Sequence, residues 1–346
     1  MRAGSWSLGG WLRAAELKRF IVKPSARIDA VFERAASLGV LFIVDDGVMV
    51  GWLTDAAIRR HILDGGSLDG VVADLATAVG KSKAQVTLEP ESAPVSAVIE
   101  GGRLVSIAVR PPIPPPIAVV MAGGRGQRLR PITDKVPKPL LKVGNSSIVE
   151  RILRGLGAAG ITDCYLSVNY KAREFESRLR DGKQLGIELR YLKEESKLGT
   201  AGALSLLPKK PKVPVLVTNA DILTRLDYAR IVEFHRTEGG AATMAAIPYV
   251  TQVPYGVARN QGARLVGIEE KPDISVLCNA GIYVLEPEAL SVVRKGKPLD
   301  MPDLLSRLVE KGKQVNVFPV IERWFDIGSP EDFKQVLMEF ATYEEE

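Results

Sequence analysis

The sequence predicts an α/β protein in which a small domain precedes a larger one built on an open, mostly parallel sheet. Its 346 residues exceed the roughly 250–300 that one hydrophobic core usually supports, so two domains are expected. Residues 111–116 contain five prolines, a composition that excludes a central strand or a helix interior and favours an extended linker. After this linker, patterns of buried strands and amphipathic helices alternate, as in parallel sheets covered on both faces.

The composition excludes several classes of protein. No apolar stretch reaches the roughly 18–20 residues of a membrane span and no clear signal peptide begins the chain, so we expect a cytoplasmic protein without a membrane partner. A net charge of +5 permits a polyanionic small molecule but lacks the dense basic stripe of a nucleic-acid binder. With two cysteines and two histidines, any metal is expected to be a hard cation held by carboxylates.

The first domain, residues 1–110, is expected to contain a helix at 30–38, strands at 40–44 and 48–53, and a helix that starts at Thr54 and Asp55. A strand at 85–88 and a strand–turn–strand unit at 94–109 follow. This order resembles a cystathionine-β-synthase-type (CBS) module with a second copy that lacks most of its helices.

The CBS resemblance implies a site for an adenosine nucleotide, in which Asp55 would hold ribose hydroxyls. The residues themselves allow a simpler interpretation, because Thr54 or Asp55 can cap the following helix. Since the second copy is truncated, we favour capping or a scaffold for a homodimer over ligand sensing.

The second domain, residues 117–346, supplies the alternating pattern. A capping box from Ser147 to Glu150 starts one helix, and others are expected near 174–180, 201–206, 228–236 and 303–310. Strands are expected at 117–121, 163–168, 188–192, 215–218, 242–247 and 281–285. Ligands of such sheets bind at the carboxyl ends of the strands.

A glycine-rich turn follows the first strand of this domain. Its glycines let the backbone approach a ligand and aim several N–H groups at phosphate oxygens. No Gly-Lys-Ser/Thr follows, so it is no Walker A loop, and Leu129 at the third glycine position disfavours a nicotinamide dehydrogenase. The six basic residues of segment 121–142 suit a triphosphate. We therefore expect a nucleotide to be bound by Ala122, Gly123, Gly124 and Gly126.

The whole run from 121 to 143 resembles the signature of sugar-1-phosphate nucleotidyltransferases (nucleotide-sugar pyrophosphorylases), with Gln127 in place of the usual threonine. The resemblance implies a catalytic role for Arg128 on the phosphates and for Lys138 near the α-phosphate. It also implies that Gly199 and Thr200 lie against the base while Glu194 reads its edge.

The base itself follows from hydrogen-bonding chemistry. A carboxylate accepts from both adjacent donors of guanine, whereas glutamine suits uracil or thymine better, so Glu194 favours GTP. Its neighbour Glu195 is an open alternative for the same role.

Two acids are candidate metal ligands. Asp221 follows a strand that ends at residue 218, where ligands of an open α/β sheet bind. The resemblance identifies Asp326 as the second ligand. Two carboxylates fit Mg²⁺, which also takes substrate phosphates and keeps several waters.

The resemblance further implies a sugar-phosphate site. Gly256 would pack against the sugar, Glu270 would accept from its hydroxyls, Lys271 would hold its phosphate, and Asn279 would bind hydroxyls. His235 is expected to be structural.

The expected activity is nucleotidyl transfer: an NTP, with GTP favoured, and a sugar 1-phosphate give an NDP-sugar and pyrophosphate. Two alternatives are a non-catalytic adenosine-nucleotide sensor with an inert transferase domain, and a pyrophosphorylase that uses UTP or dTTP.

Overall fold

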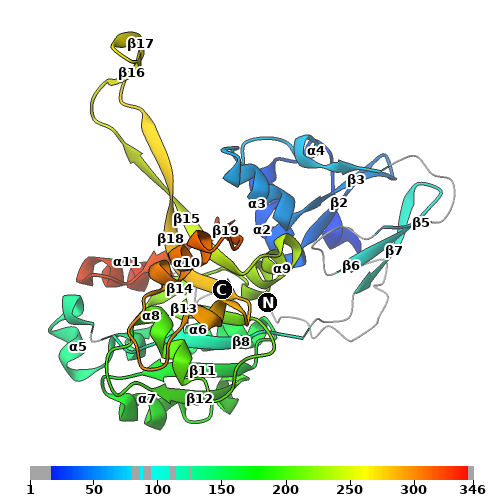
Figure 1. The fold of residues 1–346 in the computed structure, drawn as a ribbon. Helices are drawn as coiled ribbons and strands as arrows, with labels where there is room; N and C mark the ends of the chain where they lie inside the picture. The colour runs from blue at the N-terminus through cyan, green and yellow to red at the C-terminus, as the bar shows by residue number, and fades with distance from the viewer. Residues whose placement is uncertain (1–16, 80–85, 89–94, 110–113, 125, 342–346) are drawn as a thin grey trace.

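The computed structural model describes residues 17–341 apart from 80–85, 89–94, 110–113 and 125. Much of the expected linker therefore lies outside the described residues. Figure 1 shows an N-terminal lobe beside a larger body that begins with β8 (Ile117–Met121). Each part has hydrophobic clusters of its own.

The N-terminal lobe contains the elements that the sequence predicts. Its first sheet has the order β1-β2-β3-β4, and its second the order β5-β6-β7. Thr54 caps α3, because its Oγ1 accepts a hydrogen bond from the Ala57 amide at 3.1 Å. The resemblance of this lobe to a CBS module stays a prediction. The bounds are β1 (Ile21–Val22), α2 (Ile28–Leu38), β2 (Val40–Asp45), β3 (Val48–Thr54), α3 (Asp55–Leu63), α4 (Val72–Leu75), β4 (Thr77–Ala78), β5 (Val86–Leu88), β6 (Val95–Glu100) and β7 (Arg103–Val109).

The body is built on a seven-stranded sheet of order β12-β11-β8-β13-β18-β15-β19. The pairings make β18 antiparallel to both neighbours, while the other strands share one direction. The predicted fold class, an open and mostly parallel α/β sheet, is confirmed. The other strands are β11 (Asp163–Val168), β12 (Glu188–Lys193), β13 (Val215–Asn219), β15 (Ala242–Gln252), β18 (Asp273–Leu285) and β19 (Val315–Pro319).

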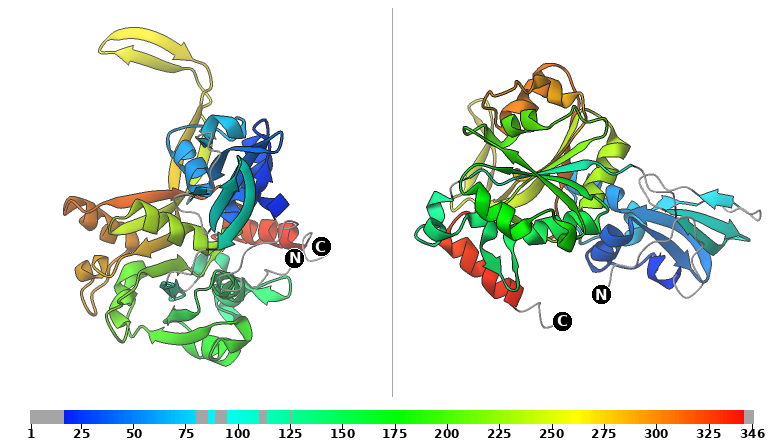
Figure 2. Two further views of the ribbon diagram at one scale, coloured as in Figure 1. Left: turned by 90° about the vertical axis from the view of Figure 1, so that its right-hand side faces the viewer. Right: turned by 90° about the horizontal axis from the view of Figure 1, so that it is seen from below.

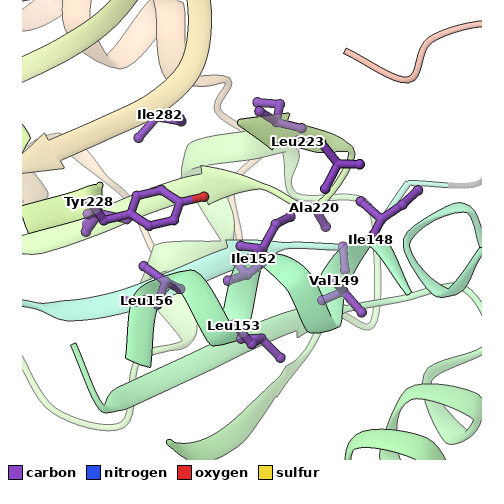
Figure 3. Packing of buried hydrophobic residues seen from close by; sticks show 14 of the residues in the cluster. Ile148, Val149, Ile152, Leu153, Leu156, Ala220, Leu223, Tyr228 and Ile282 are labelled. Carbon is purple, nitrogen blue, oxygen red and sulfur yellow. The ribbon is translucent and has the colours of Figure 1, made fainter. Parts of the chain in front are cut away.

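Helix α6 (Ile148–Ala158) packs against one face of this sheet. Ser147 and Glu150 form the predicted capping box: the Ser147 amide donates to Glu150 Oε2 at 2.7 Å. Figure 3 shows the apolar residues of α6 gathered beside Ala220, Leu223 and Ile282. Since Ala220 directly precedes Asp221, the packing of α6 sets the position of a candidate metal ligand.

The remaining helices mostly match their predicted ranges. The helix expected over 201–206 is instead one α-turn followed by a 3₁₀ helix. Among the described residues, no helix is both long enough and apolar enough to cross a bilayer. The helices are α5 (Ile132–Lys135), α7 (Ala172–Leu179), α8 (Gly199–Gly202), α9 (Tyr228–Glu238), α10 (Met301–Glu310) and α11 (Pro330–Ala341).

A long ribbon, here called the arm, projects from the body, as Figures 1 and 2 show. It is formed where β15 and β18 continue beyond the sheet, with β16 (Val257–Gln261) and β17 (Arg264–Glu269) at its tip. The sequence pattern predicts strands that end at residue 247 and begin at residue 281, whereas the structure extends them to Gln252 and from Asp273, so most of the arm was not predicted. Its side chains are largely exposed.

His235 lies buried between α9 and the sheet, as its structural interpretation predicts. Its Nδ1 is 2.7 Å from Thr243 Oγ1, and its Nε2 is 3.3 Å from Glu286 Oε1. Burial lowers the pKa of His235 below its ordinary 6.5, although Glu286 opposes this. The folded state therefore prefers the neutral imidazole.

We expect this histidine to make the fold less stable in mild acid. Because the folded pKa is depressed, its stabilising contribution is present above about pH 6.5 and is lost as the pH falls through the folded pKa. Unfolding temperatures between pH 5 and pH 8 measure the effect. His235→Gln should flatten this dependence and His61→Gln should leave it intact; equal profiles for all three proteins would contradict the assignment.

Candidate active site

A pocket of about 630 Å³ opens at the carboxyl edge of the sheet. Its walls come from the glycine-rich turn after β8, the Lys138–Pro139 turn, and the ends of β11, β12 and β13. It is lined by Met121, Ala122, Gly123, Gly124, Gly126, Gln127, Arg128, Leu129, Lys138, Pro139, Asn169, Glu195, Ser196, Lys197, Ala220, Asp221 and Gly328.

Packing explains two of the glycines in the turn. At Gly123 a Cβ would lie 2.5 Å from Glu194 Oε1, and at Gly126, where φ is +60°, it would lie 3.0 Å from Lys138 Cβ. Gly124 differs, because a Cβ there would meet no atom of the described residues within 4 Å. The space beside Gly124 is therefore available to a ligand that approaches the backbone.

The two candidate metal ligands lie close together although 105 positions separate them in the sequence (326 − 221). Strand β14 (Ile222–Thr224) pairs with β20 (Trp324–Asp326), with Ile222 opposite Asp326. The Ile327 amide also donates to the Asp221 carbonyl at 3.1 Å. This short ribbon places Asp326 beside Asp221; Asp221 lines the pocket, and Asp326 is not among its lining residues.

Lys138 lies beside both acids. Its Nζ donates to Asp221 Oδ2 at 2.7 Å and is 3.9 Å from Asp326 Oδ1. Arg128 is near the same position: a Cβ on Gly328 would be 3.6 Å from both Arg128 Nη1 and Asp326 Oδ2. Two cations and two acids thus form one cluster, and Arg128, Lys138 and Asp221 of this cluster line the pocket.

The pKa of Asp326 is raised above its ordinary 3.8. Burial is the largest cause and the charge of Asp221 adds to it, while Lys138 and Arg128 act in the opposite direction. The two carboxylates therefore repel each other, and a cation between them is favourable.

The chemistry of this donor set fits Mg²⁺. The described residues hold no group of three or more His, Cys, Asp or Glu side chains suited to a metal. Two carboxylates are nevertheless enough for Mg²⁺, which takes few protein oxygens and completes its shell with phosphate and water. A metal at this position would have to displace the Lys138 ammonium.

The structure gives Glu194 a different task from the one expected. Its Oε1 accepts from Ser167 Oγ at 2.7 Å and its Oε2 accepts from the Leu198 amide at 3.0 Å. Both carboxylate oxygens therefore fasten the loop after β12. Glu195 lines the pocket instead, which is the alternative that the sequence left open.

Gly199 and Thr200 do not line the pocket either. A Cβ on Gly199 would lie 2.7 Å from the Leu299 carbonyl, and the Thr200 amide donates to Asp300 Oδ1 at 3.0 Å. The Met301 amide in turn donates to Thr200 Oγ1 at 2.8 Å. These contacts tie the loop to the start of α10.

The expected sugar-phosphate residues lie outside the pocket lining. Gly256, Glu270 and Lys271 belong to the arm, where a Cβ on Gly256 would lie 2.8 Å from Glu270 Oε2. Asn279 lies on β18, and its Oδ1 accepts from the Gly281 amide at 2.9 Å. These four residues are therefore not part of the pocket lining, and their expected roles toward the sugar phosphate stay predictions.

Asp55 lies in the N-terminal lobe and is buried. Its Oδ2 accepts from Arg59 Nε at 2.9 Å, while its Oδ1 is buried without a hydrogen-bond partner among the described residues. One oxygen of this carboxylate is therefore engaged in an ion pair, and the other is buried within the lobe.

Sequence reasoning did not identify Asn169, Ser196 or Lys197, all of which line the pocket. Asn169 directly follows β11, and its Nδ2 donates to the Glu194 carbonyl at 2.8 Å. Its position just after a strand of the parallel sheet was the available signal.

The fold is an open α/β sheet whose glycine-rich turn lies at the carboxyl edge, where such sheets bind their ligands. The profile of the nucleotidyl transferase family matches residues 117–342. The chain therefore belongs to the nucleotidyl transferase family.

Similar proteins agree with this assignment. Mannose-1-phosphate guanyltransferase from Debaryomyces hansenii is 32% identical over 224 residues, or 62% of each chain. Its counterpart from Saccharomyces cerevisiae is 33% identical over the same shares. The matched region thus spans about three fifths of these curated relatives, 62% of their length.

Solved structures share the fold. HddC from Yersinia pseudotuberculosis matches with a TM-score of 0.51 at 24% identity, covering 64% of this chain and 98% of that one. The same protein complexed with GMP-PN matches with a TM-score of 0.51 at 23% identity, over the same shares. At these identities the likeness concerns the fold alone.

Proposed function

We propose that this chain transfers a nucleotidyl group from GTP to a sugar 1-phosphate and releases pyrophosphate. The observation that carries the proposal is the cluster of Arg128, Lys138, Asp221 and Asp326, of which the first three line the pocket beside the glycine-rich turn. The similarity to mannose-1-phosphate guanyltransferases supports guanine as the base and mannose 1-phosphate as the acceptor.

The reaction needs positive charge rather than a general base. A phosphate oxygen of the sugar 1-phosphate attacks the α-phosphorus of the nucleotide. The bond between the α-phosphorus and the oxygen that bridges it to the β-phosphorus breaks, and pyrophosphate leaves with the electron pair of that bond. The nucleophile is already an anion at pH 7, so the main obstacle is repulsion between anions. Arg128 and Lys138 would offset this repulsion.

Asp221 and Asp326 would hold Mg²⁺, which supplies further positive charge to the phosphates when bound. Without the metal, Lys138 neutralises the same two acids at 2.7 and 3.9 Å. Metal binding would therefore free its ammonium for the α-phosphate. Lys138 would act as a countercharge in both states, first for the acids and then for the nucleotide.

We expect Glu195 rather than Glu194 to set the preference for guanine. Glu195→Gln should lower the ratio of kcat/KM for GTP over UTP by about 10- to 100-fold, because a charged acceptor of two donors is lost. Glu194→Gln should mainly lower the unfolding temperature, since both of its oxygens serve the loop. The reverse pattern, with selectivity lost only in Glu194→Gln, would contradict this assignment.

A substrate grid tests the function itself. The full chain is incubated with ATP, CTP, GTP, UTP or dTTP and several sugar 1-phosphates, and pyrophosphate release and product mass are measured. GTP with mannose 1-phosphate is expected to be fastest. Absence of pyrophosphate from every pair, together with AMP or ATP binding to the N-terminal lobe, would support the nucleotide-sensor alternative.

A homodimer through the N-terminal lobe is retained as part of the proposal. It rests on the CBS resemblance of this lobe. Light scattering of the full chain measures the mass directly.

A further inference from the structure

The contact between the N-terminal lobe and the body is centred on Arg59 of α3. Its side chain is fully buried, and it is the largest of the fully buried side chains in the described structure. Around it, Ala56 joins the main core of the body, while Ile321 of the body packs against the core of the lobe. The two parts therefore share a continuous packed boundary.

The guanidinium of Arg59 bonds to both sides of this boundary. Nη2 donates to Glu322 Oε1 at 2.6 Å and Nη1 to Glu322 Oε2 at 3.2 Å, a two-pronged ion pair. Nη1 also donates to the Pro319 carbonyl at 2.6 Å. The guanidinium carbon lies 4.2 Å from the centroid of the Phe318 ring.

Asp55 holds Arg59 in this orientation from within the lobe. Its Oδ2 accepts from Nε at 2.9 Å, one helical turn away on the same helix. The guanidinium is thus fixed between an acid of the lobe and an acid of the body. A planar guanidinium that is hydrogen-bonded on several edges restricts the position of its partner more than an exposed, flexible ion pair does.

The body residues that Arg59 holds lead directly to the active site. Pro319 ends β19, Glu322 follows it, and β20 (Trp324–Asp326) then carries the candidate metal ligand Asp326. The far end of this segment is held by the Ile327 amide on the Asp221 carbonyl. The segment 319–327 is therefore fastened at one end by the lobe and at the other by the candidate metal site.

We propose that Arg59 is a positioning residue for the nucleotidyl transfer: through Glu322 it keeps β20 in the register that places Asp326 beside Asp221. This proposal rests on the proposed function and assigns the N-terminal lobe to the scaffold of the active site. Asp55, to which the CBS resemblance assigns a ribose contact, acts as the support of Arg59.

Glu322→Gln tests the proposal, because it keeps the shape of the side chain and removes its charge. Three quantities are measured: hydrogen exchange of residues 319–328 without substrates, Mn²⁺ binding by electron paramagnetic resonance without nucleotide, and kcat with KM for both substrates. We expect faster exchange, and Mn²⁺ affinity and kcat each lower by about 10- to 100-fold. KM for the sugar 1-phosphate should change less than about twofold, since no substrate contact is removed.

Two further variants complete the design. A second, exposed ion pair joins the N-terminal lobe to the body: Glu238 Oε1 accepts from Arg60 Nε at 2.8 Å. Glu238→Gln removes the acid of this pair and should leave all three quantities unchanged. Glu322→Asp keeps the charge on a shorter stem and should fall between Glu322→Gln and the parent chain. It also remains informative if Glu322→Gln does not fold.

The outcomes are distinguishable. Unchanged Mn²⁺ binding and kcat in a folded Glu322→Gln or Glu322→Asp variant would overturn the proposal and leave the contact as a docking surface only. A parent chain that binds Mn²⁺ more tightly than Glu322→Gln but transfers no nucleotide would support the positioning role and overturn only the proposed function. A parent chain that binds no Mn²⁺ would overturn the positioning role toward the metal.

Discussion

Replacing Asp326 with asparagine is expected to lower turnover by about 10²- to 10³-fold and to raise the unfolding temperature. The loss follows from removing one of two charges that would hold Mg²⁺ against the phosphates. The gain follows from the raised pKa of Asp326, which burial and Asp221 cause. Because this pKa is raised, the contribution of the Asp326 carboxyl group to stability is complete below its ordinary pKa of 3.8. It is lost as the pH rises through the pKa of the folded state.

At pH 7 the ionised Asp326 therefore costs stability that the variant recovers. The side chain is 47% exposed, so solvent screens the repulsion and the gain is on the order of a few tenths of a kcal/mol. Thermal unfolding from pH 4 to pH 8 should show the difference narrowing toward acid.

Two other variants serve as a comparison and a control for Asp326→Asn. Asp221→Asn should also lose turnover but should lower the unfolding temperature, because it removes the 2.7 Å pair with Lys138. Asp303→Asn, in the exposed first turn of α10, should change turnover little. An Asp326→Asn protein with full turnover would refute the metal assignment.

Replacing Lys138 with methionine is expected to abolish most turnover while making the protein more responsive to Mg²⁺. Turnover should fall by about 10²- to 10³-fold, since a cation beside the reacting phosphates is lost. Without Mg²⁺ the variant should be less stable by about 1–2 kcal/mol, because two neighbouring acids lose their shared countercharge. Added Mg²⁺ then no longer competes with an ammonium.

The expected signature is a larger rise in unfolding temperature with Mg²⁺ for Lys138→Met than for the parent chain. Lys142→Met serves as the matched control, because Lys142 is exposed on the short strand β9 (Lys142–Val143) nearby. If Mg²⁺ stabilises the parent and Lys138→Met equally, Lys138 and the metal do not share a position.

The central sheet could be predicted because its strands are buried on both faces. Strand 117–121 is a continuous apolar run, and strand 163–168 is mainly apolar apart from Asp163 and Ser167; the structure reproduces the limits of both. The arm was missed for the opposite reason: Tyr249, Val250 and Ile268 are apolar yet 55–67% exposed, so no buried face marks the strands.

The glycine-rich turn and the acid pair could be located from their sequence motifs, and in the structure Lys138 lies beside both Asp221 and Asp326. The direction of single side chains could not be predicted. Whether Glu194 or Glu195 faces the pocket depends on Ser167 and on the Leu198 amide, which fasten Glu194 from other parts of the fold.

The arm has a consequence for how proteins with this sheet can diverge. Strands β15 and β18 stay paired from Ala246 opposite Asn279 out to Gln252 opposite Asp273, without a corner or a change of partner. Pairs of residues can therefore be gained or lost at the far end while every pair in the core keeps its alignment. The length of the arm can therefore change during evolution with little loss of stability, as the length of a surface loop can, because the interior does not have to repack.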